Sequence, residues 1–191
     1  YTKTLAGYAR QEAKMSGQDI HTILETGYAD APTGLLVLPH FAGAATPYMD
    51  PGSKGAILGL SVANTQQDIY LSCMEGVVYE MRLNMDALKE AGVVVKALRA
   101  TGGGARSKVW MQMKADILNI PVTALRSEEA GAAGSAMLVG VAVGVFANLE
   151  EAAKVMVVPM DTYYPRQNVH EQYESTYQRY TKVYNAVRPL V

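Results

Sequence analysis

The chain has 191 residues, of which 49% are hydrophobic and 18% charged, and its formal net charge is −1. This length suits one domain, or one lobe of a larger enzyme, with a sizeable core. The near-neutral charge argues against a non-specific nucleic-acid binder or a polybasic membrane-surface protein, and the apolar content argues against disorder. The one cysteine, Cys73, allows no internal disulfide and predicts a reducing, cytoplasmic setting. Because the chain starts at Tyr1 without a basic-then-apolar leader, we expect no signal peptide and a piece of a longer protein.

The first half predicts two helical segments around two short strands. We expect a helix over residues 2–25 with a break at Ser16-Gly17, a buried strand over 34–40, a second strand over 55–61, and a long helix over 65–91. Thr65 and Asp68 have the spacing of a capping box, and Gly92 ends this long helix. The side chains expected on its inward face are Ile69, Cys73, Met74, Val77, Met81, Leu83 and Leu88.

The second half predicts strands that alternate with helices, which is typical of an α/β lobe. Strands are expected over 93–101 and 121–125, and helices over 107–119, 129–146, 149–156 and 170–188. The last helix carries a row of tyrosines on one face, which are Tyr173, Tyr177, Tyr180 and Tyr184. Acidic residues rather than a basic cluster lie beside this row, so we expect core packing and not a base-stacking surface.

The segment over residues 130–147 carries no charge and is long enough to raise the question of a membrane span. More than half of it is Gly or Ala, and it has acidic flanks with no Lys or Arg anchor near its exit. We therefore expect a helix that is buried on all sides in the core, and no membrane span.

The strongest local signal is the glycine-rich turn that follows the strand over 93–101. Gly102, Gly103 and Gly104 allow a close approach of the backbone to a ligand, and the helix that starts near Ser107 directs free N–H groups toward it, which favours phosphate. The spacing matches neither a Walker A loop nor a dinucleotide-binding fingerprint. On its own, the pattern fits a tight turn without a ligand equally well.

Three blocks in order resemble one known family. Residues 38–61 (LPHFAGAATPYMDPGSKGAILGLS) and 55–75 (GAILGLSVANTQQDIYLSCME) are followed by 101–122 (TGGGARSKVWMQMKADILNIPV) and the small-residue helix over 129–146. They resemble the C-terminal lobe of the FGGY family of carbohydrate kinases, which includes xylulokinase, glycerol kinase and gluconokinase, with xylulokinase-like members nearest in pattern.

The resemblance implies an α/β fold, an actin-like (ribonuclease-H-like) ATPase lobe with a mixed sheet flanked by helices. It implies that residues 1–191 are the nucleotide-binding lobe, with the start of the lobe truncated and the N-terminal sugar-binding lobe absent. The implied reaction transfers the γ-phosphoryl group of ATP to a sugar or polyol hydroxyl. The alternative is a non-catalytic actin-like lobe that serves as an assembly or regulatory module.

The resemblance also implies which residues meet the nucleotide. Gly102, Gly103 and Gly104 would lend backbone contacts, Ala105 would keep the wall of the site low, and Ser107 would cap the helix. Lys108 stands where a polar residue often reaches the nucleotide, although a solvated first-turn lysine fits this position equally well.

Other residues flagged by the resemblance are expected to be structural. We expect Glu75 to bond neighbouring backbone, His40 to be a loop or core histidine, and Asp50 to form a turn beside Pro51. Lys54 and Tyr8 stand where many members have Arg and Trp.

The chain contains no G-D-Q-type motif, so no catalytic residue and no metal ligand is expected within it. The implied partners are ATP or ADP, Mg²⁺ with ligands mostly outside this chain, and a sugar or polyol bound by the absent lobe. A homodimer is allowed, and neither nucleic acid nor membrane is expected. Alone, the chain should bind adenine nucleotide weakly and phosphorylate no sugar.

Overall fold

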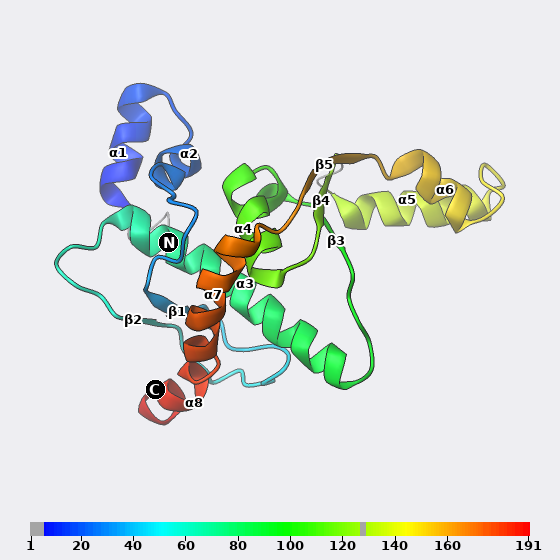
Figure 1. The fold of residues 1–191 in the computed structure, drawn as a ribbon. Helices are drawn as coiled ribbons and strands as arrows, with labels where there is room; N and C mark the ends of the chain where they lie inside the picture. The colour runs from blue at the N-terminus through cyan, green and yellow to red at the C-terminus, as the bar shows by residue number, and fades with distance from the viewer. Residues whose placement is uncertain (1–5, 127–128) are drawn as a thin grey trace. The chain divides into compact units, whose positions relative to one another are not determined.

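The structure, a computed structural model, describes residues 6–126 and 129–191 (Figure 1). The chain divides into two compact units. Unit 1 contains the chain up to Val94 together with Gln167–Val191, and unit 2 contains Val95–Arg166. Unit 2 is therefore an insertion in the sequence of unit 1.

Unit 1 begins with two short helices, α1 (Gly7–Ser16) and α2 (Ile20–Glu25). Gly17 ends α1 in the left-handed conformation at φ 71°, and the Asp19 carboxylate accepts the N–H groups that begin α2. The predicted break is thus confirmed in the described residues, whereas residues 2–5 of the expected helix lie outside them. The two helices pack through a small cluster of buried side chains, which are Ala6, Ala9, Ile23 and Leu24.

An antiparallel hairpin of β1 (Leu36–Leu38) and β2 (Ala56–Leu58) confirms the two predicted strands, in shorter form. It precedes α3 (Gln66–Glu90), whose capping box is also confirmed. The Asp68 N–H donates to Thr65 Oγ1 at 3.2 Å, and the Thr65 N–H donates to Asp68 Oδ2 at 2.8 Å. Gly76 allows β1 to lie directly on α3, because a Cβ there would be 2.3 Å from the Val37 carbonyl oxygen.

The inward face of α3 is not the one that the sequence predicts. Of the expected residues only Met74 is buried, while Val77 and Leu88 are exposed and the other four are half-buried. The buried residues are Leu71, Ser72, Met74, Glu75, Gly76, Val78 and Tyr79. Polar side chains can face inward here because tyrosines from a distant part of the chain meet them.

Those tyrosines come from α7 (Gln167–Tyr180), which is followed by α8 (Val183–Val187) and a 3₁₀ turn, η2 (Arg188–Leu190). The single helix expected over 170–188 is thus broken near Thr181. The core-packing prediction is confirmed for Tyr173, Tyr177 and Tyr180, which are all buried. Their hydroxyl groups meet acidic side chains of α3: Tyr177 donates to Asp86 at 2.5 Å and Tyr180 to Glu80 at 2.6 Å.

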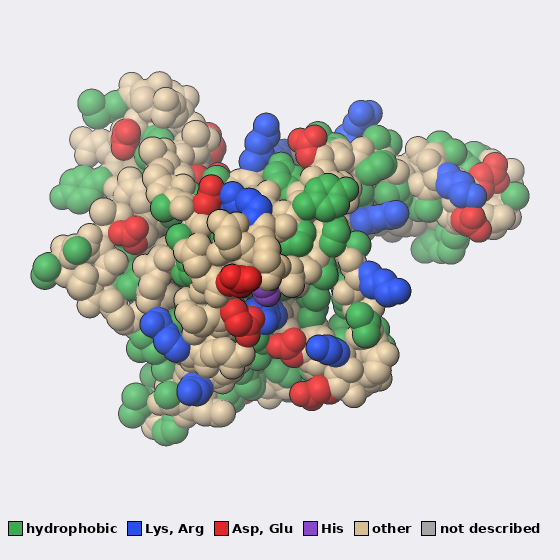
Figure 2. Space-filling view, in the orientation of Figure 1, with side chains coloured by type: hydrophobic (Ala, Val, Ile, Leu, Met, Phe, Trp, Pro, Cys, Tyr) green, Lys and Arg blue, Asp and Glu red, His purple; other side chains and the backbone are tan. Residues whose placement is uncertain are grey.

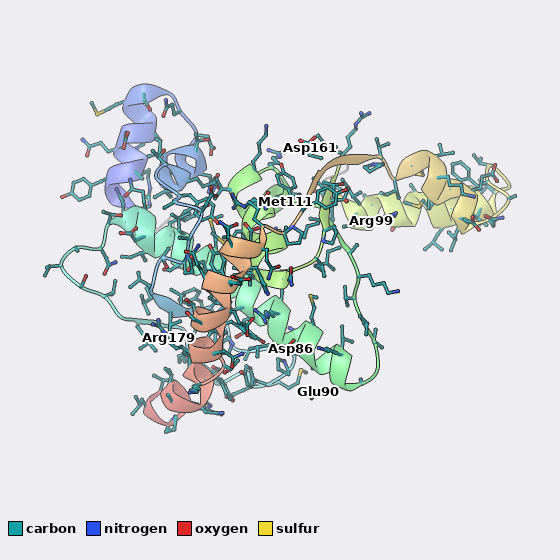
Figure 3. The ribbon with its side chains drawn as sticks, viewed as in Figure 1. Asp86, Glu90, Arg99, Met111, Asp161 and Arg179 are labelled. Atoms are coloured by element: carbon teal, nitrogen blue, oxygen red, sulfur yellow. The ribbon has the colours of Figure 1, made fainter. Side chains whose placement is uncertain are left out.

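Unit 2 contains a mixed three-stranded sheet in the order β3 (Leu98–Ala100), β4 (Val122–Leu125), β5 (Pro159–Tyr163). β3 runs parallel to β4, and β5 runs antiparallel to it. The helix α4 (Lys108–Leu118) packs on this sheet through Met111 and Ala115 (Figure 3). This is the expected strand–turn–helix order.

Two details of the sheet differ from the prediction. The strand expected over 93–101 begins only at Leu98, because Leu98 pairs with Val122, the first residue of β4, and the preceding residues have no strand beside them. Val93 and Val94 are accordingly exposed. The sequence did not predict β5, because this edge strand begins with a proline and four of its five side chains are exposed, so it has no apolar run.

The apolar segment forms α5 (Ala130–Ala142), which pairs with α6 (Leu149–Met156) as a helical hairpin (Figure 1). The expectation of a helix buried on all sides is wrong: only Gly140 is buried, and Leu138 and Val139 are 61% and 60% exposed. Apolar side chains are visible on the surface of this hairpin (Figure 2). The helix ends early because Gly144 adopts φ 77° and the Val145 N–H bonds back to the Gly140 carbonyl at 2.8 Å. Among the described residues, no helix is long and apolar enough to cross a membrane.

Candidate functional site

The candidate site is the turn that joins β3 to α4 in unit 2. Gly102 has φ 83° and ψ −178°, a conformation that is essentially restricted to glycine. It leads into a 3₁₀ turn, η1 (Gly103–Ala105), in which the Ala105 N–H bonds to the Gly102 carbonyl at 3.0 Å and the Arg106 N–H to the Gly103 carbonyl at 3.2 Å. The chain thus reverses within a few residues and exposes backbone at the tip.

The start of α4 completes the turn. Ser107 Oγ accepts the Trp110 N–H at 2.9 Å, which confirms the expected helix cap. The other N–H groups of the first turn have no acceptor within the helix, and the helix dipole gives this end a partial positive charge. Lys108, on the same first turn, is exposed. This end of α4 therefore favours an anion.

The predicted residues of the turn have different surroundings. A Cβ on Gly103 would have nothing within 4 Å, so this residue faces open space. A Cβ on Gly104 would lie 2.6 Å from the ring of Trp110. Ala105 is partly buried and packs against the core cluster that contains Met111 and Val122. Gly103 is thus the position where a ligand could approach the backbone.

An ion pair with a buried carboxylate holds α4 in place. The Asp116 carboxylate is fully buried, and Arg166 donates to it from its backbone N–H at 2.8 Å and from Nη2 at 2.7 Å. Gln112 Nε2 donates to the same carboxylate at 3.0 Å. These bonds join the helix to the segment that follows β5, so the turn is carried on a fixed element.

Trp110 lies beside the turn and Lys114 lies over its ring, and the sequence pattern had singled out neither residue. Helical side chains point back toward the N-terminus, so a large residue early in a helix covers the turn before it. The chain's single tryptophan, three residues after the cap at Ser107, was therefore a usable signal.

Glu75 belongs to unit 1 and has the structural role that the sequence predicted. It is fully buried, and its carboxylate accepts the Thr33 N–H at 2.9 Å and the Thr33 hydroxyl at 2.8 Å. Burial raises the pKa of Glu75 to about 7, although the bonds from Thr33 and Tyr173 partly offset this effect. Glu75 therefore fixes the segment before β1 on α3.

His40 and Asp50 are also structural, as expected. His40 is buried and its Nδ1 lies 2.8 Å from Ser53 Oγ. Asp50 accepts the Gly52 N–H at 3.0 Å, which forms the turn, and it also binds Tyr184 and Arg188. Burial acts to raise the pKa of Asp50, but the bonds from Tyr184 and Arg188 outweigh it and lower the pKa below its usual value.

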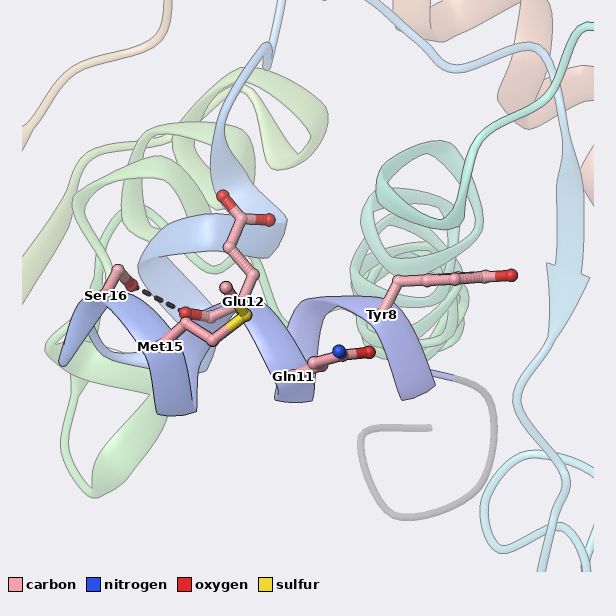
Figure 4. A pocket seen from close by; sticks show the side chains of 5 residues that line it. All are labelled: Tyr8, Gln11, Glu12, Met15 and Ser16. Atoms are coloured by element: carbon pink, nitrogen blue, oxygen red, sulfur yellow. Dashed lines mark hydrogen bonds between the residues drawn. The ribbon is translucent and has the colours of Figure 1, made fainter.

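A separate hollow lies on α1, away from the turn in sequence (Figure 4). Its walls come from one helix and are formed by Tyr8, Gln11, Glu12, Met15 and Ser16. Tyr8 is 82% exposed, and Ser16 only bonds back to the Glu12 carbonyl. Within residues 6–126 and 129–191, no group of three or more His, Cys, Asp or Glu side chains could hold a metal ion.

The mixed sheet and the helix packed on it, joined by the glycine turn between β3 and α4, form an α/β lobe, and its solved structural neighbours assign it to the actin-like (ribonuclease-H-like) ATPase class. Comparison with known proteins then gives the family. Residues 3–143 match the model of the FGGY family of carbohydrate kinases, C-terminal domain. The chain belongs to this family, as the sequence blocks indicated.

Individual relatives agree with this assignment. The chain is 31% identical over 157 residues to xylulose kinase of Bacillus subtilis and 36% identical over 153 residues to glycerol kinase of Lactococcus lactis. These matches cover 82% and 80% of this chain but only 32% and 30% of the relatives. The crystal structure of xylulose kinase from Rhodospirillum rubrum superposes with a TM-score of 0.80 at 27% identity, over 97% of this chain and 38% of that one. The chain thus spans about a third of the length of the curated relatives it matches.

Proposed function

We propose that this chain is the nucleotide-side lobe of an ATP-dependent kinase that phosphorylates a hydroxyl group of a sugar or polyol. The family match and the names of the relatives, xylulose kinase and glycerol kinase, support this reaction class. The sugar would be bound mainly by a lobe that corresponds to the unmatched part of the relatives. We also propose that the protein is located in the cytoplasm.

One observation carries the proposal: Gly103 faces open space at the tip of the turn, between Gly102 with its glycine-specific backbone and Gly104 against the Trp110 ring. A phosphate or ribose could approach its backbone, where the first N–H groups of α4 supply donors and Lys108 supplies a positive charge. Gly102, Gly104 and Ala105 would shape the turn, and Ser107 would hold the helix start. The adenosine and inner phosphates of ATP or ADP are the proposed ligands.

Mg²⁺ would neutralise phosphate charge in such a reaction. The described residues supply no cluster for it, so we place its ligands on the phosphates, on water and on groups outside this chain. The same holds for the group that activates the sugar hydroxyl. By itself, the chain would bind nucleotide weakly and phosphorylate nothing.

The test is Gly103→Ala in the kinase polypeptide that carries this chain, assayed by coupled ADP release with a panel of pentoses, hexoses and polyols. A methyl group at this position meets no protein atom, so the melting temperature should stay unchanged while the KM for ATP rises about tenfold. Gly131→Ala is the matched control, because its Cβ also meets nothing and it lies on α5. Unchanged ATP kinetics in Gly103→Ala would place the nucleotide elsewhere. Absence of ATP-dependent phosphorylation in the unsubstituted kinase would favour the assembly module instead.

A further inference from the structure

The three glycines of the turn have three different surroundings. Gly102 is required by its backbone conformation, and Gly103 leaves its outer side open. Gly104 has a backbone that an ordinary residue could adopt, but a Cβ would lie 2.6 Å from Cζ3 and 2.9 Å from Cε3 of Trp110. Real side chains essentially never approach so closely, so Gly104 is matched to the indole ring of this protein.

The ring itself is held in place. The backbone N–H of Trp110 donates to Ser107 Oγ, and Lys114 Nζ lies over the indole ring, 4.2 Å from its centroid. Lys114 is only 8% exposed, and burial lowers the pKa of its ammonium group. A cation over an indole face is attracted to it, more strongly where water is excluded. Moving the ring away from Gly104 would therefore break its contact with Lys114.

We propose that Trp110 is a positioning residue for nucleotide binding: its ring supports Gly104 from the protein side and so holds the Gly103 backbone toward the ligand. The proposal rests on the proposed function. A run of three glycines is conformationally free, and ordering it on binding would cost affinity. A rigid ring beneath the turn removes that cost before the nucleotide arrives.

The proposal predicts a change in nucleotide affinity with little change in chemistry. In the kinase polypeptide, Trp110→Ala should raise the KM for ATP about tenfold and change kcat by less than about threefold. Trp110→Phe keeps a ring and should recover most of the affinity. Both variants are melted in parallel, and the tryptophan emission described below decides the outcome if the Ala variant does not fold.

A double substitution separates support by the ring from direct contact with the ligand. Gly104→Ala alone should raise the KM for ATP, because its methyl group meets the ring. In the Trp110→Ala background the same substitution should add less than about twofold, because the obstacle is gone. If Gly104→Ala weakens ATP binding equally in both backgrounds, the ligand and not the ring occupies that space, and the proposal is overturned.

The ring also reports on the turn directly. Trp110 is the only tryptophan in these 191 residues, so the emission of this chain should shift saturably as ADP is added. No shift at ADP concentrations that bind, measured by equilibrium dialysis, contradicts the support of the turn by the ring. ATP kinetics unchanged by Trp110→Ala and Trp110→Phe overturn the positioning role alone. A kinase that uses no ATP overturns the proposed function, and the positioning role falls with it.

Discussion

Two helices of this chain reverse the usual relation between polarity and burial. α7 is rich in polar and charged residues, yet it places Val169, Tyr173, Thr176, Tyr177 and Tyr180 in the core of unit 1. α5 carries no charged residue, yet it buries only Gly140 and pairs with α6 as an exposed hairpin. The more polar helix is the more deeply buried one.

The difference shows that a partner surface decides burial. α7 meets α3, where carboxylates accept the tyrosine hydroxyls and Arg82 lies 4.0 Å from the centroid of the Tyr177 ring. Tyrosine contributes apolar area while its hydroxyl finds a partner, so a polar sequence can form a core. Among the described residues, α6 is the one element that makes several contacts with α5.

The largest effect is expected where the tyrosines meet. Tyr79 is fully buried against Tyr180 at 4.9 Å between ring centroids, and its hydroxyl has no hydrogen-bond partner among the described residues. Tyr79→Ala should lower the free energy of unfolding by about 3–5 kcal/mol in urea titration. Tyr79→Phe is the control and should change it by less than about 1 kcal/mol. If Phe costs as much as Ala, the hydroxyl and not the ring holds the core.

A smaller effect is expected from Glu75, a buried carboxyl group of α3 that lies near Tyr173 of α7. The pKa of Glu75 is raised from 4.5 to about 7, so the folded state favours the protonated form. The stabilisation of the fold that comes from this raised pKa of Glu75 is complete below pH 4.5 and is lost as the pH rises through 7. Glu75→Gln should remove this loss and gain on the order of 3 kcal/mol at pH 8 relative to pH 4.5, less any hydrogen bond that is weakened.

The measurement is the difference in unfolding free energy between wild type and Glu75→Gln across pH 4 to 8. The difference cancels the contributions of all other groups, which both proteins share. A difference that does not vary with pH would mean that the pKa of Glu75 is the same in the folded and the unfolded state.

The smallest effect is expected on α5. Leu138→Gln should change the free energy of unfolding by less than about 0.5 kcal/mol, because Leu138 is already 61% exposed. The same substitution at Leu71, which is 4% exposed on α3, is the matched control and should cost several times more. A large loss at Leu138 would show that α5 is covered in solution, and light scattering would reveal self-association as the cause.

Local signals predicted much of the fold. The Thr65 and Asp68 capping box, the break at Gly17 and the cap at Ser107 depend on residues close together in sequence, and all three are confirmed. The failures concern long-range partners. The inward face of α3 depends on α7, the start of β3 depends on the register with Val122, and the exposure of α5 depends on what covers it.

The candidate site divides in the same way. The glycine turn and its capped helix were predicted from neighbouring residues and from the family blocks. Which glycine faces the outside could not be predicted, because it depends on where the Trp110 ring lies. Nucleotide contacts at Gly102, Gly103, Gly104, Ala105, Ser107 and Lys108 remain predictions.

The order of the two units along the chain has a consequence for biosynthesis. The inner unit, Val95–Arg166, can close its sheet as soon as Arg166 has left the ribosome. The outer unit is started first but completed last, because α3 must wait for the tyrosines of α7. Until α7 has been synthesised, the nascent chain leaves the ring of Tyr79 without its tyrosine partners, so within these 191 residues α3 is the helix that most needs protection by a chaperone.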